Sequence, residues 1–251
     1  MWPAGLPYDL TPATTAYMAV VLFGAAFVRG YSGFGFAALV VTGAALVTDP
    51  FHFVPVVLIV DIFLTIAQAR GIWAHIAWRR VAGLFGGALL GVPLGLTILM
   101  AAGLDLARAV ISVFVLAMCA ALWSGWKWRG AAGTPAHLGA GFVSGIANAA
   151  AVGGLPVAVF FAAQTIPATV FRATLIAYFT ALDLWTVPMM AARGMISADT
   201  LWASVMAMPV LLLGVWLGGR QFLSANPSEF RRFAILLLAG LASLGLIKSV
   251  I

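Results

Sequence analysis

Long apolar stretches, separated by short breaks rich in charge, proline or glycine, fill most of the 251-residue chain. A helix needs about 20 apolar residues to cross the roughly 30 Å of membrane hydrocarbon. Seven stretches are long enough: Thr11–Val28, Phe51–Ala69, Val81–Ala102, Leu106–Trp126, Ala168–Ala192, Leu201–Gly218 and Phe230–Val250. Three are short and rich in Gly or Ala: Phe34–Val47, Leu138–Val152 and Leu155–Gln164. The alternation typical of an outer-membrane barrel is absent, so the pattern predicts an all-α integral membrane protein of about ten membrane segments.

The composition supports this fold class and excludes others. Hydrophobic residues make up 64% of the chain and charged residues only 8%, whereas soluble domains carry roughly 25% charged residues. A single cysteine, Cys119, rules out a disulfide framework, and three dispersed histidines show no ligand spacing. The sequence therefore predicts no metal site and no cofactor.

Basic residues indicate how the chain is oriented. The formal net charge is +6, but the 13 basic residues are not clustered as nucleic-acid binding would need. They concentrate in the loop Arg70–Arg80, around Lys127 and Arg129, and in the stretch Arg220–Arg232. By the positive-inside rule these loops are cytoplasmic, which places both termini outside.

Similar segments recur in the two halves of the chain. The stretch Leu89–Gly95 resembles Leu212–Gly218 at an offset of 123 (212 − 89), and Asp61 corresponds to Asp183 at 122 (183 − 61). Upstream, Phe27–Gly30 resembles the segment 142–145 at an offset of 115 (142 − 27). Such self-similarity is the signature of an internal repeat.

The repeat divides the chain into residues 1–130 and 131–251, with five segments in each unit. Two copies with an odd number of crossings lie in the membrane with opposite orientation. Inverted repeats with paired short, glycine-interrupted segments are typical of secondary transporters, whose substrate site lies near the middle of the membrane.

Two glycine-rich elements, Arg29–Phe36 and Ser144–Pro156, occupy corresponding places in these units. Glycine lets the backbone leave helical geometry, and a helix that starts inside the membrane offers free N–H groups and a positive dipole end to an anion. Alternatively, the small residues only allow close helix packing. The candidate substrate-binding residues are Arg29, Gly30, Tyr31, Ser32, Gly33, Gly35, Asn148, Gly153, Gly154 and Arg172.

Two aspartates lie within apolar stretches, where an ionisable group is costly and is usually paired, protonated or functional. Asp61, Thr65 and Gln68 share one helix face, and Asp183 aligns with Thr186 and Arg172 on another. Three interpretations stay open: the aspartates carry protons, neutralise an arginine such as Arg29, or anchor the unwound backbone.

The order of these elements resembles the TauE/SafE family of sulfite and organosulfonate exporters. The resemblance rests on Phe27–Gly35, on Gly141–Gly145 continuing to Gly153–Pro156, and on the two similar halves. It implies a multi-pass permease of the bacterial inner membrane for small anions such as sulfite, sulfoacetate or isethionate. In this chain the stretch after Ser144 is richer in alanine than in glycine.

The function predicted from the sequence is secondary transport of a small anion, held between two half-helix ends, with proton coupling as an open question. Its expected partners are the anion and the lipid bilayer; protons and a homodimer are left open, and no nucleic acid is expected. One alternative is a carrier of neutral or cationic solutes that uses the aspartates, and another is a structural membrane subunit. An intramembrane enzyme is not expected, since no nucleophile or metal constellation is visible.

Overall fold

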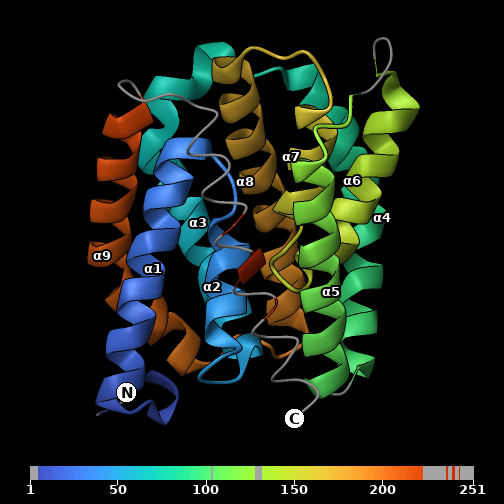
Figure 1. Cartoon of the computed structure of the whole chain (residues 1–251). Helices are drawn as coiled ribbons and strands as arrows, with labels where there is room; N and C mark the ends of the chain where they lie inside the picture. The colour runs from blue at the N-terminus through green and yellow to red at the C-terminus, as the bar shows by residue number, and fades with distance from the viewer. Residues whose placement is uncertain are drawn as a thin grey trace.

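The computed structural model describes residues 5–102, 104–127 and 132–222, with four further positions between 236 and 243; the side chains of residues 67–70, 104, 105, 108 and 222 lie outside the description. These residues form nine α-helices and two short 3-10 helices (Figure 1). The α-helices are α1 (Pro12–Ser32), α2 (Phe36–Ala44), α3 (Pro50–Ile72), α4 (Trp78–Ala101), α5 (Leu104–Trp123), α6 (Thr134–Asn148), α7 (Gly154–Ala162), α8 (Ala168–Ala192) and α9 (Ala198–Phe222). The 3-10 helices are η1 (Pro7–Asp9) and η2 (Trp73–His75).

The nine helices match nine of the ten predicted segments. The bounds of α8 agree with the prediction at both ends, whereas α6 begins four residues before the predicted Leu138. Thr134 and Pro135 open this helix, and proline suits the first turn because its missing N–H has no partner there. The tenth predicted segment, Phe230–Val250, falls almost entirely outside the described residues.

The outer surface of the bundle is apolar. Side chains such as Leu90, Ile66 and Leu106 are 71%, 65% and 61% exposed, far more than a water-soluble protein leaves uncovered in one continuous surface. Four described helices, α1, α4, α8 and α9, are long and apolar enough to cross a membrane. The structure is thus an all-helical, multi-pass membrane protein.

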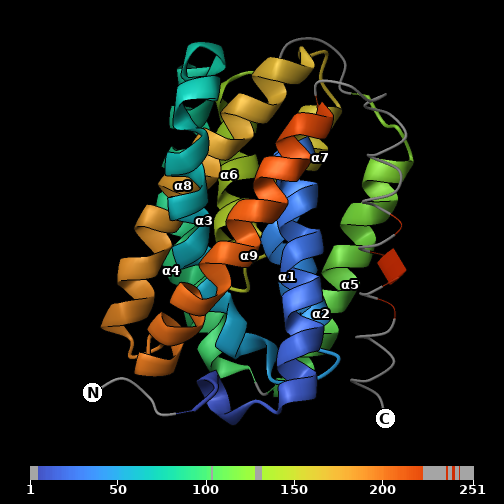
Figure 2. The same ribbon diagram turned by 90° about the vertical axis from the view of Figure 1, so that its left-hand side faces the viewer.

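Glycines bring two pairs of long helices into backbone contact. A Cβ on Gly141 of α6 would lie 1.8 Å from the carbonyl oxygen of Leu84 in α4. Similarly, a Cβ on Gly218 of α9 would lie 2.1 Å from the carbonyl oxygen of Phe27 in α1. These pairs, α4 with α6 and α1 with α9, have the most extensive contacts of the described fold, and Figure 2 shows α1 and α9 side by side. Only glycine permits such close approach.

Two nine-residue helices, α2 and α7, lie between these pairs. Nine residues span about 13–14 Å, roughly half of the hydrocarbon thickness. In both views α2 occupies the lower half of the molecule and α7 the upper half (Figures 1 and 2). Both are therefore half-helices, which places their ends inside the bundle.

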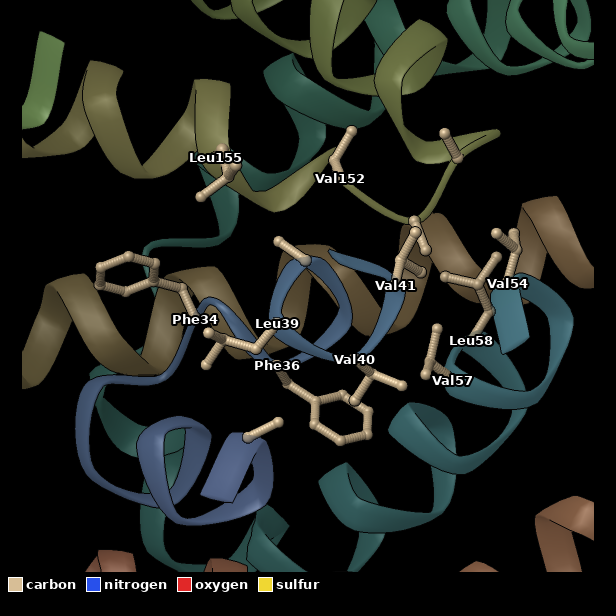
Figure 3. Close-up of a cluster of buried hydrophobic side chains, with 14 of the residues drawn as sticks. Phe34, Phe36, Leu39, Val40, Val41, Val54, Val57, Leu58, Val152 and Leu155 are labelled. Atoms are coloured by element: carbon tan, nitrogen blue, oxygen red, sulfur yellow. The ribbon is translucent and has the colours of Figure 1, made fainter. Parts of the chain in front are cut away.

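Apolar packing holds α2 at the centre of the fold. Its residues Leu39, Val40 and Val41 are almost completely buried. Figure 3 shows them among the side chains of Val57 in α3 and Leu155 at the start of α7. Between helices in a membrane, such side chains stabilise the fold through close van der Waals packing and not through removal from water.

Side-chain contacts define two opposite ends of the bundle. At one end, the hydroxyl of Tyr8 in η1 is hydrogen-bonded to the carbonyl of His52 at 3.0 Å and to the hydroxyl of Thr200 at 2.9 Å. At the other end, Arg80 donates to the side-chain oxygen of Gln164 at 3.1 Å, and Lys127 donates to the carbonyl oxygen at position 162 at 3.0 Å. Arg80 and Lys127, which come from two of the basic loops predicted to be cytoplasmic, thus lie at the same end.

Candidate functional site: a buried polar cavity between two half-helices

A small cavity lies where the first turns of α2 and α7 approach each other. Its volume is about 30 Å³, which is room for two or three water molecules. The polar side chains that line it are those of Arg29, Asp61, Asn148 and Asp183. Gly33, Gly35 and Gly154 line it as well, together with the apolar residues Phe34, Phe36, Ala37, Ala38, Leu58, Ala151, Leu155 and Phe179.

Arg29 comes from the last turn of α1 and forms a buried ion pair with Asp61 of α3. Its Nε donates to Oδ1 of Asp61 at 2.5 Å and its Nη2 donates to Oδ2 at 3.0 Å. The same Nη2 donates to the hydroxyl of Thr65 at 2.8 Å. The side chain of Arg29 is 2% exposed, and this bidentate geometry is the arrangement that offsets the cost of burying two charges.

Asn148 lies at the end of α6 and contacts Asp183 of α8. Its Nδ2 donates to Oδ1 of Asp183 at 3.3 Å and to the hydroxyl of Thr186 at 3.0 Å. Thr186 in turn donates to the carbonyl of Leu182. Here a neutral amide stands where the first cluster has a guanidinium, so this cluster lacks a positive charge of its own.

The two clusters meet across the cavity. Asp61 from the first cluster and Asp183 from the second both line it. Two carboxylates that share one site repel each other when both are ionised. Because Arg29 binds both oxygens of Asp61, Asp183 is the carboxyl group whose charge would be less well compensated.

Left-handed backbone conformations turn the chain at both breaks. Gly33 and Gly35, which flank Phe34 between α1 and α2, have φ of 80° and 87°. At the second break this conformation falls on Ala151, with φ of 57°, and not on Gly153 or Gly154. A left-handed alanine costs about 1–2 kcal/mol relative to an ordinary conformation, so the surrounding structure must hold this turn.

Gly153 acts through close packing. A Cβ at this position would lie 2.5 Å from the carbonyl oxygen of Ser144 and 2.7 Å from the Cβ of Asn148. The hydroxyl of Ser144 donates to the carbonyl of Gly153 at 2.6 Å, and the hydroxyl of Tyr178 donates to that of Ser144 at 2.9 Å. This hydrogen-bonded chain ties the second break to α6 and α8 and thereby positions Asn148.

Five other predicted site residues have structural roles or undescribed side chains. The hydroxyl of Ser32 donates to the carbonyls of Val28 and Phe34, at 2.8 and 3.0 Å, and so closes the first break. Gly30 packs against α9, Tyr31 is buried, and Arg172 donates to the carbonyl of Gly30 at 2.7 Å. None of these four lines the cavity among the described residues. The side chain of Gln68 lies outside the described residues.

Three residues that matter here were not predicted from the sequence. Ala151 carries no side-chain signal for a left-handed turn. Tyr178 lies five residues before Asp183 on α8, about 140° further round the helix, so its spacing gave no signal that both residues contribute to this site. Phe179 lines the cavity beside Gly154, and an aromatic residue in an apolar helix offers no distinguishing pattern.

The arrangement suits binding of a small charged solute more than covalent chemistry. Helices α2 and α7 both point their positive N-terminal ends into the cavity, and each end carries roughly half a unit of positive charge. The first N–H groups of a helix have no acceptor within it. No group of three or more metal-ligating side chains occurs among the described residues.

Helices long enough to span a membrane, two half-helices and a buried charged cavity between them together define a multi-pass membrane protein of the transporter type. The family model described as "Sulfite exporter TauE/SafE" matches residues 18–244. The chain therefore belongs to the TauE/SafE sulfite exporter family, whose members are membrane permeases. No curated protein and no solved structure matched the chain.

Proposed function

We propose that this protein is a secondary transporter of small anions that binds its substrate in the cavity between α2 and α7. The observation that carries the proposal is that both half-helices start at this cavity. Two such ends supply about one unit of positive charge, while Arg29 and Asp61 neutralise each other. When Asp183 is protonated, the cavity thus has a positive field to offer an anion.

The proposed substrate is sulfite or a two-carbon organosulfonate such as isethionate or sulfoacetate. Family membership supports a sulfur-containing anion. A cavity of about 30 Å³ favours the smallest of these, and a two-carbon sulfonate requires α2 and α7 to separate further. No nucleotide-binding motif is present in the sequence, so an ion gradient or the substrate's own gradient drives transport.

An inverted repeat is part of the proposal, and the helix contacts support it. The first helix of the first half, α1, packs against the fourth helix of the second half, α9. In the same way, the first helix of the second half, α6, packs against the fourth helix of the first half, α4. The hydrogen bonds favour a different upstream register, in which Arg29 corresponds to Asn148 at an offset of 119 (148 − 29). Gly35 then corresponds to Gly154 at the same offset (154 − 35), at the start of each half-helix.

The proposed location is the bacterial inner membrane, with the end that carries Arg80 and Lys127 in the cytoplasm. Arg79 and Arg220 lie at this end too, whereas the opposite end carries Asp49 and the acidic start of α9. This charge difference supports the orientation. In the proposed orientation the described N-terminal residues lie outside.

Ligand-induced stabilisation tests the proposal directly. Purified protein is heated with sulfite, isethionate or acetate, and an anion at a hundred times its Kd stabilises the folded state by about 2.7 kcal/mol. Asn148→Leu, which removes the amide facing Asp183, is expected to abolish the shift, whereas Thr200→Val, far from the cavity, retains it. If no small anion stabilises the protein, the proposed site is wrong. Stabilisation by a small amine cation alone would favour the alternative of a cation carrier.

A further inference from the structure

The two aspartates of the cavity are chemically unequal, although they occupy similar places. Asp61 accepts two hydrogen bonds from Arg29, whereas Asp183 accepts one from the neutral amide of Asn148. Asp183 is only 3% exposed. In the described part of the chain its carboxyl group has no salt bridge.

The surroundings of Asp183 determine when it can carry a charge. The charged or titratable groups that face it are Asp61 from α3, Arg29 from α1 and Tyr178 from its own helix. Helix α6 contributes the neutral Asn148, α7 contributes only Gly154 and Leu155 to the cavity, and α4 contributes no lining residue. An ionised Asp183 therefore depends on the guanidinium already bound to Asp61 and on the two helix ends.

We propose that Asp183 carries the exchangeable proton that couples anion movement to proton movement, and that Asp61 stays ionised as the counter-ion of Arg29. The inference rests on the proposed function. Charges near the cavity sum to about +1 when Asp183 is protonated, from one ion pair and two helix ends of roughly half a unit each. One negative charge neutralises this sum. Either the substrate anion or the carboxylate of Asp183 supplies it.

The substrate anion and the carboxylate of Asp183 compete for the same positive field. This competition couples anion movement to proton movement. An anion binds while Asp183 is protonated, since a carboxylate at this place would repel it. When the cavity opens to the other side, the anion leaves, the O–H bond of the carboxyl group breaks and the proton passes to water. The protein then returns to its first orientation without the anion, and the carboxylate of Asp183 supplies the negative charge in its place. One monovalent anion and one proton thus cross together.

The described conformation fits one step of this cycle, because both carboxyl groups line the same small cavity. Two ionised carboxylates would repel each other across a space of about 30 Å³, so this conformation corresponds to the form in which Asp183 is protonated. This is the form that accepts an anion.

Transport in proteoliposomes tests the assignment. The wild type, loaded with unlabelled sulfite, is expected to exchange it for external radiolabelled sulfite and, under an inward proton gradient, to accumulate sulfite with proton uptake. Asp183→Asn, which mimics the protonated form, is expected to keep the exchange but to lose gradient-driven accumulation, with exchange rates that no longer depend on pH. Asp199→Asn, at the far end of α9, removes an equal charge and is expected to behave as the wild type.

The two kinds of failure are distinguishable. If Asp183→Asn still accumulates sulfite against the sulfite gradient, the inference is wrong but the proposed anion transport stands. Absence of both exchange and accumulation in the wild type overturns the proposed function.

Infrared spectroscopy of the wild type keeps the inference testable if Asp183→Asn does not fold. A carbonyl stretch from a protonated carboxyl group is expected at neutral pH, and it should vanish reversibly as the pH rises. Absence of such a band at every pH overturns the inference. So does a band that persists in folded Asp183→Asn protein.

Discussion

Replacing Gly141 by alanine is expected to force α4 and α6 apart. The new Cβ would lie 1.8 Å from the carbonyl oxygen of Leu84, whereas ordinary van der Waals contact begins near 3.4 Å, so the helices must separate by about 1.6 Å (3.4 − 1.8). The obstructing atom belongs to the backbone, and no side-chain rotation can relieve the overlap. Overpacking of this kind costs about 1–3 kcal/mol or more.

Thermal unfolding in detergent measures this cost, and α6 offers a matched control. For a chain of this size 1 kcal/mol corresponds to about 2–4 °C, so Gly141→Ala is expected to lower the Tm by about 2–12 °C. A Cβ on Gly139, two residues earlier, would meet no atom within 4 Å, and Gly139→Ala should leave the Tm unchanged or raise it. Equal Tm values for the two variants would refute the close approach of α4 and α6.

The pair α1 and α9 gives an independent version of the same measurement. A Cβ on Gly218 would meet the carbonyl of Phe27 at 2.1 Å, whereas a Cβ on the neighbouring Gly219 would lie 3.9 Å from its nearest contact, the carbonyl of Gly30. We expect Gly218→Ala to destabilise the fold about as strongly as Gly141→Ala, with Gly219→Ala close to the wild type. Destabilisation in one pair only would argue against equivalent packing in the two halves.

Three further predictions concern single contacts. Ala151→Gly is expected to raise the free energy of unfolding by up to about 1 kcal/mol, because relief of the left-handed alanine exceeds the added freedom of the unfolded chain; a lower Tm would contradict this. Burial raises the pKa of Tyr8, so its contribution to stability is complete below pH 10 and is lost as the pH rises through the raised pKa. Tyr8→Phe removes the hydrogen bond to Thr200, so the free energy of unfolding should fall by about 1 kcal/mol at neutral pH. As the pH rises, the Tm of this variant should fall less than that of the wild type. Either Arg29→Met or Asp61→Asn alone should cost about 3–5 kcal/mol, and the double variant should cost less than either; additive losses in a double-mutant cycle would exclude the ion pair.

Most of the fold could be predicted from the lengths of the apolar stretches and from the charged, proline and glycine residues that separate them. The segment Ala168–Ala192 lies between Pro167 and Arg193, and it is a helix with those bounds. The short apolar segments predicted at Phe34–Val47 and Leu155–Gln164 are the half-helices, because glycines precede both and nine apolar residues are too few to cross. These features depend on local sequence, which is why they are readable from it.

The partners of the polar residues could not be predicted in the same way. Arg29 and Asp61 are 32 residues apart in the chain, and their contact depends on how α1 packs against α3. The sequence places polar residues on one face of each helix, but it does not say which faces meet. For this reason the offset of 115, which matches Phe27 to Phe142 by residue type, differs from the 119 that the hydrogen bonds favour.

The difference between Arg29 and Asn148 is what makes the cavity suitable for coupling. Two arginines in equivalent places would neutralise both aspartates, and the cavity would then hold no carboxyl group free to exchange a proton. Two asparagines would leave two buried carboxyl groups and no cation, a site that repels anions whenever either group ionises. One arginine and one amide instead give a permanent ion pair beside a single carboxyl group. Because Arg29 and Asn148 differ, Asp61 stays ionised as a counter-ion while Asp183 is the residue that exchanges a proton.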